Sequence, residues 1–249
     1  MFKVLCFILS CLGPLSAVAG ECVILLHGLV RSAASMGELQ AKLEAGGFTV
    51  VNLDYPSREH SIEQLAELAL PASFKACEAN AARPVNIVTH SLGGILVRQY
   101  FQHRSHPDLK RVVMLAPPNQ GSEVVDALRD TPGFETINGP AGMQLGTGPE
   151  DLPRLLGAVD FELGVIAGTR SVNLLLSTLL PDPDDGKVSV ASAGVEGMCA
   201  LLMLPVTHPF IMSNDRVIAQ VMQFLRHGAF SADGATHLPC QAQAGPRSA

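Results

Sequence analysis

The hydrophobic pattern of this chain alternates between short, continuous apolar runs and longer segments with apolar residues at helical spacing. Continuous runs of Val, Ile and Leu are typical of strands that are buried on both faces of a sheet. The pattern predicts six strands, over residues 22–26, 48–53, 85–89, 112–115, 163–167 and 201–206.

Helices are predicted between several of these strands. Ser32 is the expected cap of the first helix, which Gly46-Gly47 ends. Ser61 and Gln64 form a capping box ahead of a second helix, which Pro71 is expected to interrupt or kink. Two further helices are predicted over residues 92–103 and 214–227.

The alternation of strand and helix predicts an α/β fold, because parallel strands need crossover helices that cover both faces of the sheet. No internal repeat or linker is evident, so a single domain over residues 20–230 is expected. Residues 231–249 are rich in Ala, Gln, Gly and Ser and are interpreted as a C-terminal tail. The segment at about 117–160 is dense in Gly and Pro, and a connection of this length is typical of a functional lid.

Residues 1–19 are interpreted as a cleaved signal peptide. Lys3 supplies a positive start, residues 4–12 are apolar, and Ala17-Val18-Ala19 has the small-x-small pattern of a signal-peptidase site. The apolar stretch is too short for a membrane span, which needs about 20 residues. A buried N-terminal strand is the alternative, but no alternation or turn supports it. We therefore expect a periplasmic or secreted protein without stable membrane insertion.

Composition narrows the possible functions. The chain has 249 residues, of which 47% are apolar and 16% charged, and its formal net charge is −6. Intrinsic disorder requires low hydrophobicity together with high net charge, so a folded protein is expected. No dense run of Lys and Arg is present, which argues against a nucleic-acid partner.

The sequence Thr89-His90-Ser91-Leu92-Gly93-Gly94 follows the third predicted strand and begins a helix. A serine at a tight turn between a strand and a helix presents its hydroxyl at the carboxyl edge of the sheet, and the flanking residues must be small. The alternative interpretation is that Ser91 only caps the helix.

This segment resembles the nucleophile elbow, usually G-x-S-x-G, of the α/β-hydrolase superfamily. Thr89 departs from the pattern, since it stands where the first glycine is usual. The resemblance covers roughly residues 22–228 and is nearest to compact bacterial lipases and carboxylesterases. It implies an α/β-hydrolase fold with a lid insertion after the fourth strand. A six-stranded sheet is implied, because the chain starts at the strand before His27-Gly28 and lacks two edge strands of the full fold.

The resemblance also implies a catalytic triad in the chain order Ser, Asp, His. Ser91 is then the expected nucleophile, and His208, which follows the sixth strand, is the expected general base. Among the acids of loop 181–188, Asp185 is favoured. Its Asp-Gly-x-Val setting is similar to the acid loop of bacterial lipases.

Two other acids share that loop. Asp184 is the runner-up for the triad, and Asp182 is interpreted as a solvated turn residue. Ca²⁺ binding is another interpretation of the cluster, but three carboxylates in one loop lack a complete set of ligands. The chain also has no C-x-x-C motif, so neither a metal nor a cofactor is expected.

The segment His27-Gly28-Leu29 resembles the one that supplies an oxyanion-binding N–H group in lipases and esterases. The residue after the nucleophile, Leu92, would supply the second N–H group. Only the backbone amides of Leu29 and Leu92 carry this expected function. His27, Gly28 and His90 are expected to line the substrate site, with His90 beside the elbow.

Four cysteines remain after removal of the predicted signal peptide, and four cysteines allow three pairings. The implied fold selects among them, because parallel strands all start at the edge opposite the active site. Cys22 and Cys199 head strands, Cys77 lies just upstream of the third strand, and Cys240 follows a helix that descends to that edge. The resemblance therefore implies Cys22–Cys77 and Cys199–Cys240 disulfides.

The implied function is hydrolysis of a carboxylic ester through an acyl-enzyme on Ser91. Acyl transfer by the same triad is one alternative, and a non-catalytic binding module on a hydrolase scaffold is another. Apolar residues of the lid region favour a small-molecule or lipid ester with an apolar chain, although the same residues could simply cover the core. They are Phe134, Ile137, Met143, Leu145, Leu152, Leu155 and Leu156.

Overall fold

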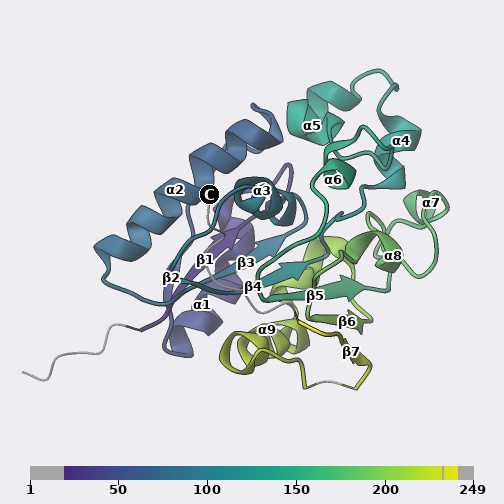
Figure 1. Ribbon diagram of the computed structural model, residues 1–249. Coiled ribbons are helices and arrows are strands. Elements are labelled where there is room, and N and C mark those ends of the chain that lie inside the picture. The colour runs from purple at the N-terminus through teal and green to yellow at the C-terminus, as the bar shows by residue number, and fades with distance from the viewer. Residues whose placement is uncertain (1–19, 232, 241–249) are drawn as a thin grey trace, which may run out of the picture.

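The computed structural model describes residues 20–231 and 233–240, so the predicted signal peptide lies outside the described residues. Within them the chain forms a seven-stranded sheet in the order β2-β1-β3-β4-β5-β6-β7. Neighbouring strands are parallel except for β7, which is antiparallel to β6. Helices cover both faces of this sheet (Figure 1). The predicted α/β class is therefore confirmed.

All six predicted strands are present, and a seventh follows them. Strands β1, β3 and β5 are buried along their whole length, which explains their continuous apolar runs. The bounds are β1 Cys22–Leu26, β2 Thr49–Val51, β3 Val85–His90, β4 Leu109–Leu115, β5 Leu163–Gly168, β6 Ala200–Leu204 and β7 Ala235–His237.

Strand β7 corrects the prediction of a six-stranded sheet, since it falls in the segment interpreted as a tail. It has three residues, none of them buried, so it leaves no hydrophobic pattern in the sequence. Its position is set by pairing with β6, where Leu202 lies opposite Ala235. The N–H group of Leu238 also donates to the carbonyl of Cys199 at 2.8 Å. An edge strand of this kind depends on its neighbour rather than on its own sequence.

All four predicted helices are present, although their ends are shifted from the predicted positions. They are α1 Gly37–Ala45, α2 Ile62–Ala79, α3 Leu92–Phe101 and α9 Asp215–His227. The other helical segments are η1 Ala33–Met36, α4 Glu123–Leu128, α5 Phe134–Met143, α6 Leu152–Leu155, α7 Leu174–Ser177, α8 Val190–Ala193 and η2 His208–Ser213.

Two helix caps were predicted from the sequence, and the structure confirms one of them and shows that the other is wrong. The Ser61 capping box forms, with Gln64 N–H donating to Ser61 Oγ and Ser61 N–H donating to Gln64 Oε1. Ser32, by contrast, makes no side-chain cap, and a 3₁₀ turn precedes α1. Helix α2 runs through Pro71 without a break, because the buried residues on both sides of the exposed proline hold the helix against the sheet.

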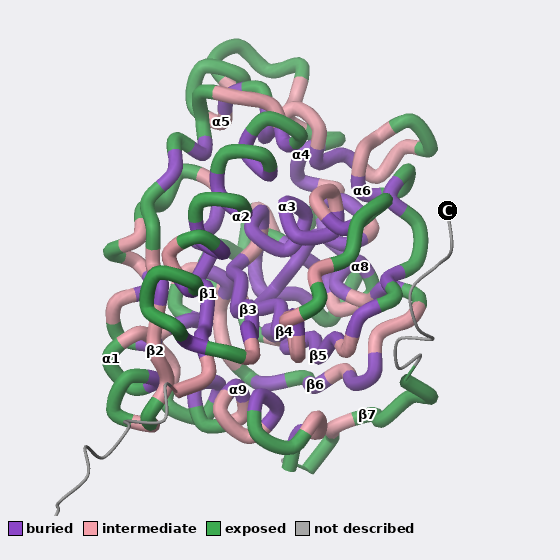
Figure 2. Tube along the Cα trace, turned by 60° about the vertical axis from the view of Figure 1, so that its left-hand side comes forward, coloured by how far each residue is buried: buried purple, intermediate pink, exposed green. Residues whose placement is uncertain are grey.

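The sheet separates two hydrophobic clusters. Figure 2 shows that the central strands are mostly buried. Successive side chains of a strand point to opposite faces. In β1, Ile24 and Leu26 face a cluster shared with α2 and α3, whereas Val23 and Leu25 face a cluster shared with α1 and α9. Both faces of β1, β3 and β5 are therefore covered, which fixes the sheet and the loops at its carboxyl edge.

The predicted lid region forms α4, α5 and α6, which lie together beyond the carboxyl end of β4 (Figure 1). Part of it belongs to the core, because Leu145 and Leu156 are buried in the cluster of α2 and α3. Ile137 and Leu155 are exposed. Some apolar residues of this region therefore cover the core, and others remain exposed at the surface.

The two implied disulfides, Cys22–Cys77 and Cys199–Cys240, are both present. Cys22 and Cys77 join the start of β1 to the last turn of α2, and Cys199–Cys240 joins the start of β6 to the segment after β7. Among residues 20–231 and 233–240, no helix combines the length and apolar character that crossing a bilayer requires.

Candidate active site

Ser91 lies at the sharp turn between β3 and α3 and has backbone angles of φ 52° and ψ −119°. A positive φ is uncommon for a residue with a side chain, and it is retained where the surrounding structure enforces it. Two backbone hydrogen bonds do so here: Ser91 N–H donates to the Leu115 carbonyl at 2.9 Å, and Gly94 N–H donates to the Ser91 carbonyl at 3.0 Å. Ser91 is half-buried, and its side chain does not cap α3.

Glycines after Ser91 let α3 approach the sheet. A Cβ atom on Gly93 would lie 2.7 Å from the carbonyl oxygen of Leu26, which is closer than real Cβ contacts. A Cβ atom on Gly94 would lie 3.1 Å from Met114 Sδ and 3.3 Å from Thr89 Oγ1. The absence of a side chain at Gly94 therefore leaves room for Thr89, which stands where a glycine is usual.

His208 and Asp185 form a buried pair across the next loops of the same edge. His208 Nδ1 lies 2.8 Å from Asp185 Oδ2, and the backbone N–H of His208 donates to the Asp185 carbonyl at 3.1 Å. The other carboxylate oxygen, Oδ1, accepts from the N–H groups of Lys187 at 3.0 Å and Val188 at 2.9 Å. Asp185 is 1% exposed and His208 is 7% exposed. Both oxygens of the acid are thus held in position, and Nε2 of His208 is left for another group.

The other two acids of this loop have different roles. Asp184 accepts from Ser177 Oγ at 2.5 Å and from Gly186 N–H at 2.6 Å, so it shapes the turn. Asp182 is exposed. Within the described part of the chain, no group of three or more His, Cys, Asp or Glu side chains is arranged to hold a metal ion.

His208 packs against His90, which precedes Ser91 in the chain. The rings of His90 and His208 have their centroids 4.9 Å apart, and His90 Nε2 donates to the His208 carbonyl at 3.2 Å. Burial lowers the pKa of His90 well below its ordinary value, and the neighbouring His208 and Arg31 lower it further. The His90 ring is therefore neutral in the folded protein at neutral pH.

The segment after β1 lies against the Ser91 turn. A Cβ atom on Gly28 would lie 2.7 Å from His90 Nδ1 and 3.3 Å from Ser91 Cβ, so glycine is needed for this approach. The amide of Leu92 is the first of α3, and the first N–H groups of a helix have no acceptor within it. Both predicted oxyanion donors, Leu29 and Leu92, therefore belong to segments adjacent to Ser91.

The three residues expected to line the substrate site are buried. His27 is 0% exposed and His90 is 2% exposed, and Gly28 is buried between them and Ser91. The His27 ring stacks on Tyr55, with ring centroids 3.9 Å apart and an angle of 10° between the rings. Burial lowers the pKa of His27, and its hydrogen bonds and the charge of Asp54 only partly offset this effect.

Three of the four described non-glycine residues with a positive φ follow strands at this edge of the sheet, and the fourth, Ala81, precedes β3. Val30, Ser91 and Ala116 have φ angles of 57°, 52° and 49°, and they follow β1, β3 and β4. A positive φ in a β-branched residue such as Val30 is a genuine outlier, and such strain clusters at functional sites. Sequence reasoning did not find Val30 or Ala116, because neither residue type favours this conformation.

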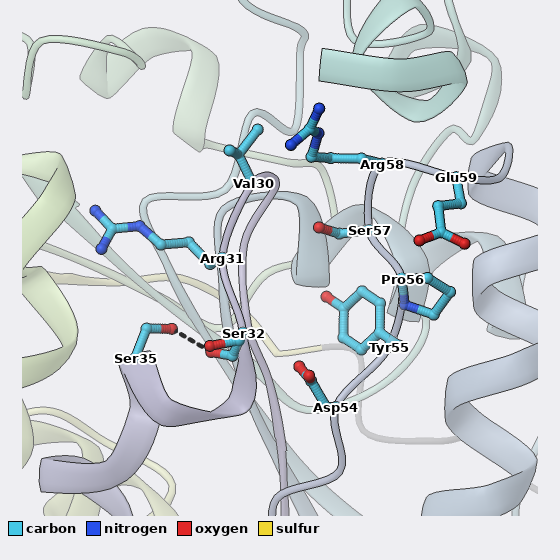
Figure 3. A pocket seen from close by; sticks show the side chains of 10 residues that line it. All are labelled: Val30, Arg31, Ser32, Ser35, Asp54, Tyr55, Pro56, Ser57, Arg58 and Glu59. Carbon is cyan, nitrogen blue, oxygen red and sulfur yellow. Dashed lines mark hydrogen bonds between the residues drawn. The ribbon is translucent and has the colours of Figure 1, made fainter. Parts of the chain in front are cut away.

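A cavity of about 520 Å³ lies next to the segment after β1 (Figure 3). Its walls come from the segments that follow β1 and β2, and they carry hydroxyl, guanidinium and carboxylate groups. Asp54 and Tyr55 belong to this lining, and sequence reasoning missed both of them. The signal available was their position directly after the second predicted strand, at the same sheet edge as Ser91. The residues that line the cavity are Val30, Arg31, Ser32, Ser35, Asp54, Tyr55, Pro56, Ser57, Arg58 and Glu59.

A family model described as "Alpha/beta hydrolase family" matches residues 23–245. The chain belongs to the alpha/beta hydrolase family. The match includes residues of all seven strands of the described sheet, among them β7, which sequence analysis had placed outside the domain. No curated protein matches the sequence at a significant level.

Several solved structures share the fold of this alpha/beta hydrolase. The mature lipase BlEst2 of Bacillus licheniformis has a TM-score of 0.63 and 18% sequence identity, over 85% of this chain and 93% of that one. Aspergillus fumigatus lipase B has a TM-score of 0.60 and 16% identity, over 84% and 53% of the two chains. Phospholipase PlaB of Legionella pneumophila has a TM-score of 0.58 and 20% identity, over 71% and 45%. This chain therefore spans only about half the length of the last two proteins.

Proposed function

We propose that this alpha/beta hydrolase cleaves carboxylic esters through an acyl-enzyme on Ser91. The observation that supports the proposal is the buried Asp185–His208 pair, in which Nδ1 of His208 lies 2.8 Å from the carboxylate and the His208 ring packs against His90, the residue before Ser91. A histidine oriented by a carboxylate and placed beside a serine hydroxyl is the arrangement that activates serine as a nucleophile.

The reaction proceeds in two halves. Ser91 Oγ attacks the ester carbonyl while its proton passes to Nε2 of His208, and the backbone N–H groups of Leu29 and Leu92 bind the oxyanion of the tetrahedral intermediate. The carbon–oxygen bond to the alcohol then breaks, and His208 donates the proton to the departing alcohol. Water repeats the sequence on the acyl-enzyme and releases the acid. Asp185 holds the His208 ring in place and stabilises its charged form.

A small-molecule or lipid ester is the proposed substrate class. Ile137 and Leu155 present exposed apolar surface in the region beyond β4, which suits an apolar acyl chain. The structural neighbours described as lipases are compatible with this class.

We also propose that residues 1–19 are a signal peptide and that the protein acts in the periplasm or outside the cell. Disulfides such as Cys22–Cys77 and Cys199–Cys240 persist in oxidising compartments.

A fluorophosphonate probe tests the proposed nucleophile, because it forms a covalent bond only with an activated serine. We expect labelling of the native protein, no labelling of Ser91→Ala, and labelling reduced by about 10³-fold or more in His208→Ala. Ser105→Ala is the matched control, since Ser105 is exposed in the loop after α3 and should leave labelling unchanged.

A series of p-nitrophenyl esters from short to long acyl chains then identifies the reaction. Hydrolysis by the native protein, lost in Ser91→Ala, supports the proposal. Labelling that persists in Ser91→Ala, or a native protein that neither reacts with the probe nor hydrolyses any ester, contradicts it.

A further inference from the structure

His27 is fully buried, yet both nitrogens of its ring have partners. Nδ1 lies 3.0 Å from the carbonyl oxygen of Gly28. Nε2 lies 3.1 Å from Asp54 Oδ1 and 3.4 Å from the backbone nitrogen of Tyr55. A buried histidine with both nitrogens engaged has a fixed ring orientation. Substrate contact is not the role of this side chain, because its exposed fraction is 0%.

Tyr55 and Asp54 hold this histidine from the segment after β2. The Tyr55 ring stacks on the His27 ring, and the Tyr55 hydroxyl donates to the His27 carbonyl. Asp54 Oδ1 also accepts from the backbone N–H of Ala33 at 2.9 Å, which ties it to the turn after β1. Figure 3 shows Asp54 and Tyr55 side by side in the wall of the cavity. The backbone on both sides of Gly28 is thus anchored to one cluster, made of His27, Asp54 and Tyr55.

The contact with Gly28 has a consequence for the next amide. A carbonyl oxygen only accepts hydrogen bonds, and the Tyr55 N–H group donates to Nε2 of His27, so both contacts place the ring hydrogen on Nδ1. The peptide bond is planar and trans, so the Gly28 carbonyl and the Leu29 N–H group point in opposite directions. Fixing the direction of the Gly28 carbonyl therefore fixes the direction of the Leu29 N–H group.

We propose that His27, together with Asp54 and Tyr55, positions the Leu29 N–H group to bind the oxyanion. These three are positioning residues, since they act through the Gly28–Leu29 peptide bond and not on the substrate. The inference rests on the proposed ester hydrolysis. It assigns a function to a cluster outside the Ser91, Asp185 and His208 group, and it accounts for a buried histidine that the reaction itself does not use.

Two near-isosteric variants separate this role from simple packing. In His27→Asn the amide nitrogen occupies about the position of Nδ1, whereas in His27→Gln it reaches about the position of Nε2. We expect His27→Asn to keep kcat within about threefold of the native value and His27→Gln to lower kcat about 10- to 100-fold. KM should stay within about twofold in both variants, because the ester in its ground state does not need the oxyanion donor.

Tyr55→Phe provides a second variant, since it keeps the stacked ring and loses the hydroxyl bond to the His27 carbonyl. We expect kcat to fall about threefold to tenfold with KM unchanged. The affinity of a boronic acid inhibitor, which becomes tetrahedral on Ser91, should fall in parallel with kcat in His27→Gln and in Tyr55→Phe. A merely structural role would instead lower the melting temperature without changing the ratio of boronate affinity to KM.

The hydrogen on the ring can be observed without any turnover. In protein with ¹⁵N-labelled histidine, the Nδ1 signal of His27 should be that of a protonated nitrogen, and it should be so in Ser91→Ala as well. A Nδ1 without hydrogen would overturn the inference.

The two proposals fail in different ways. If the native protein hydrolyses esters through Ser91 and His27→Gln retains the native kcat, the ester hydrolysis stands and the positioning role is wrong. If the native protein does not react with a fluorophosphonate, the proposed function itself fails, and the positioning role fails with it.

Discussion

Nδ1 of His208 lies 2.8 Å from Oδ2 of Asp185, although the neighbouring Asp184 is equally buried in the same loop. The two carboxylates face different partners. Asp184 is engaged by Ser177 Oγ and Gly186 N–H, and Asp185 by His208 and two backbone amides. The two adjacent acids therefore have different partners: Asp184 shapes the turn, and Asp185 orients the ring of His208.

Replacing Asp185 with Asn should lower kcat about 10³- to 10⁴-fold in the ester assay, because an amide can hold the histidine in the wrong tautomer. The exposed Asp182→Asn is the matched control and should retain native kcat. Asp184→Asn should mainly lower the melting temperature. A larger loss of kcat in Asp184→Asn than in Asp185→Asn would show that the assignment of the two acids is reversed.

Gly93→Ala tests the close approach of α3 to β1. Alanine normally stabilises a helix relative to glycine by about 1 kcal/mol. At this position the new Cβ atom would meet the Leu26 carbonyl oxygen at 2.7 Å, so we expect a loss of about 1–3 kcal/mol in the free energy of unfolding. Gly37→Ala in α1 is the control, because no atom lies within 4 Å of its Cβ position. Denaturant unfolding of both variants measures the difference, and equal stabilities would contradict the predicted clash.

Arg98 connects α3 to the region beyond β4. The guanidinium is buried, and it donates to the carbonyls of Asn119 at 2.6 Å, Pro153 at 3.1 Å and Gly157 at 2.7 Å. Burial lowers the pKa of Arg98 to about 10. Arg98→Met leaves these carbonyls without their donor and should lower the free energy of unfolding by about 3 kcal/mol.

The control for Arg98→Met is Arg104→Met, in which an exposed arginine paired with Glu67 is lost. Surface pairs contribute little to stability, so this variant should unfold like the native protein. Limited proteolysis should also cut the segment 117–160 faster in Arg98→Met. Native-like stability and proteolysis would contradict the proposed connection.

Stability should decrease as the pH falls below about 6.5, which is the ordinary pKa of histidine. The pKa values of His27, His90 and His106 are lowered by burial in the folded protein. The unfolded chain therefore binds protons that the folded chain does not. The contribution of these histidines to the free energy of unfolding is complete above pH 6.5 and is lost towards lower pH. His90 contributes most, because its complete burial lowers its pKa well below the ordinary value and the charges of His208 and Arg31 lower it further.

Denaturant unfolding at pH 7.5 and pH 5.5 measures this dependence with both disulfides intact. In His90→Asn the decrease in stability between the two pH values should be smaller than in the native protein. A decrease of the same size in the variant would mean that His90 does not cause it.

Much of the site could be predicted from sequence because its signals are local. Ser91 follows a continuous apolar strand and precedes two glycines, and all of these features lie within ten residues. Tyr55 and Asp54 carry no such signal, because their contacts with His27 join residues that are more than 25 positions apart. Their position after a predicted strand was the sole hint of a role.

The amino-acid sequence alone determined strands β1 to β6, the capping box at Ser61 and the Ser91 turn, since these depend on burial patterns and hydrogen bonds between near neighbours. Tertiary structure decided that Asp185 rather than Asp184 meets His208, that His27 is buried against Tyr55, and that β7 joins the sheet beside β6. Each of these outcomes depends on contacts between distant segments. These contacts form only when the chain has folded, so residue burial and periodicity along the sequence do not determine them.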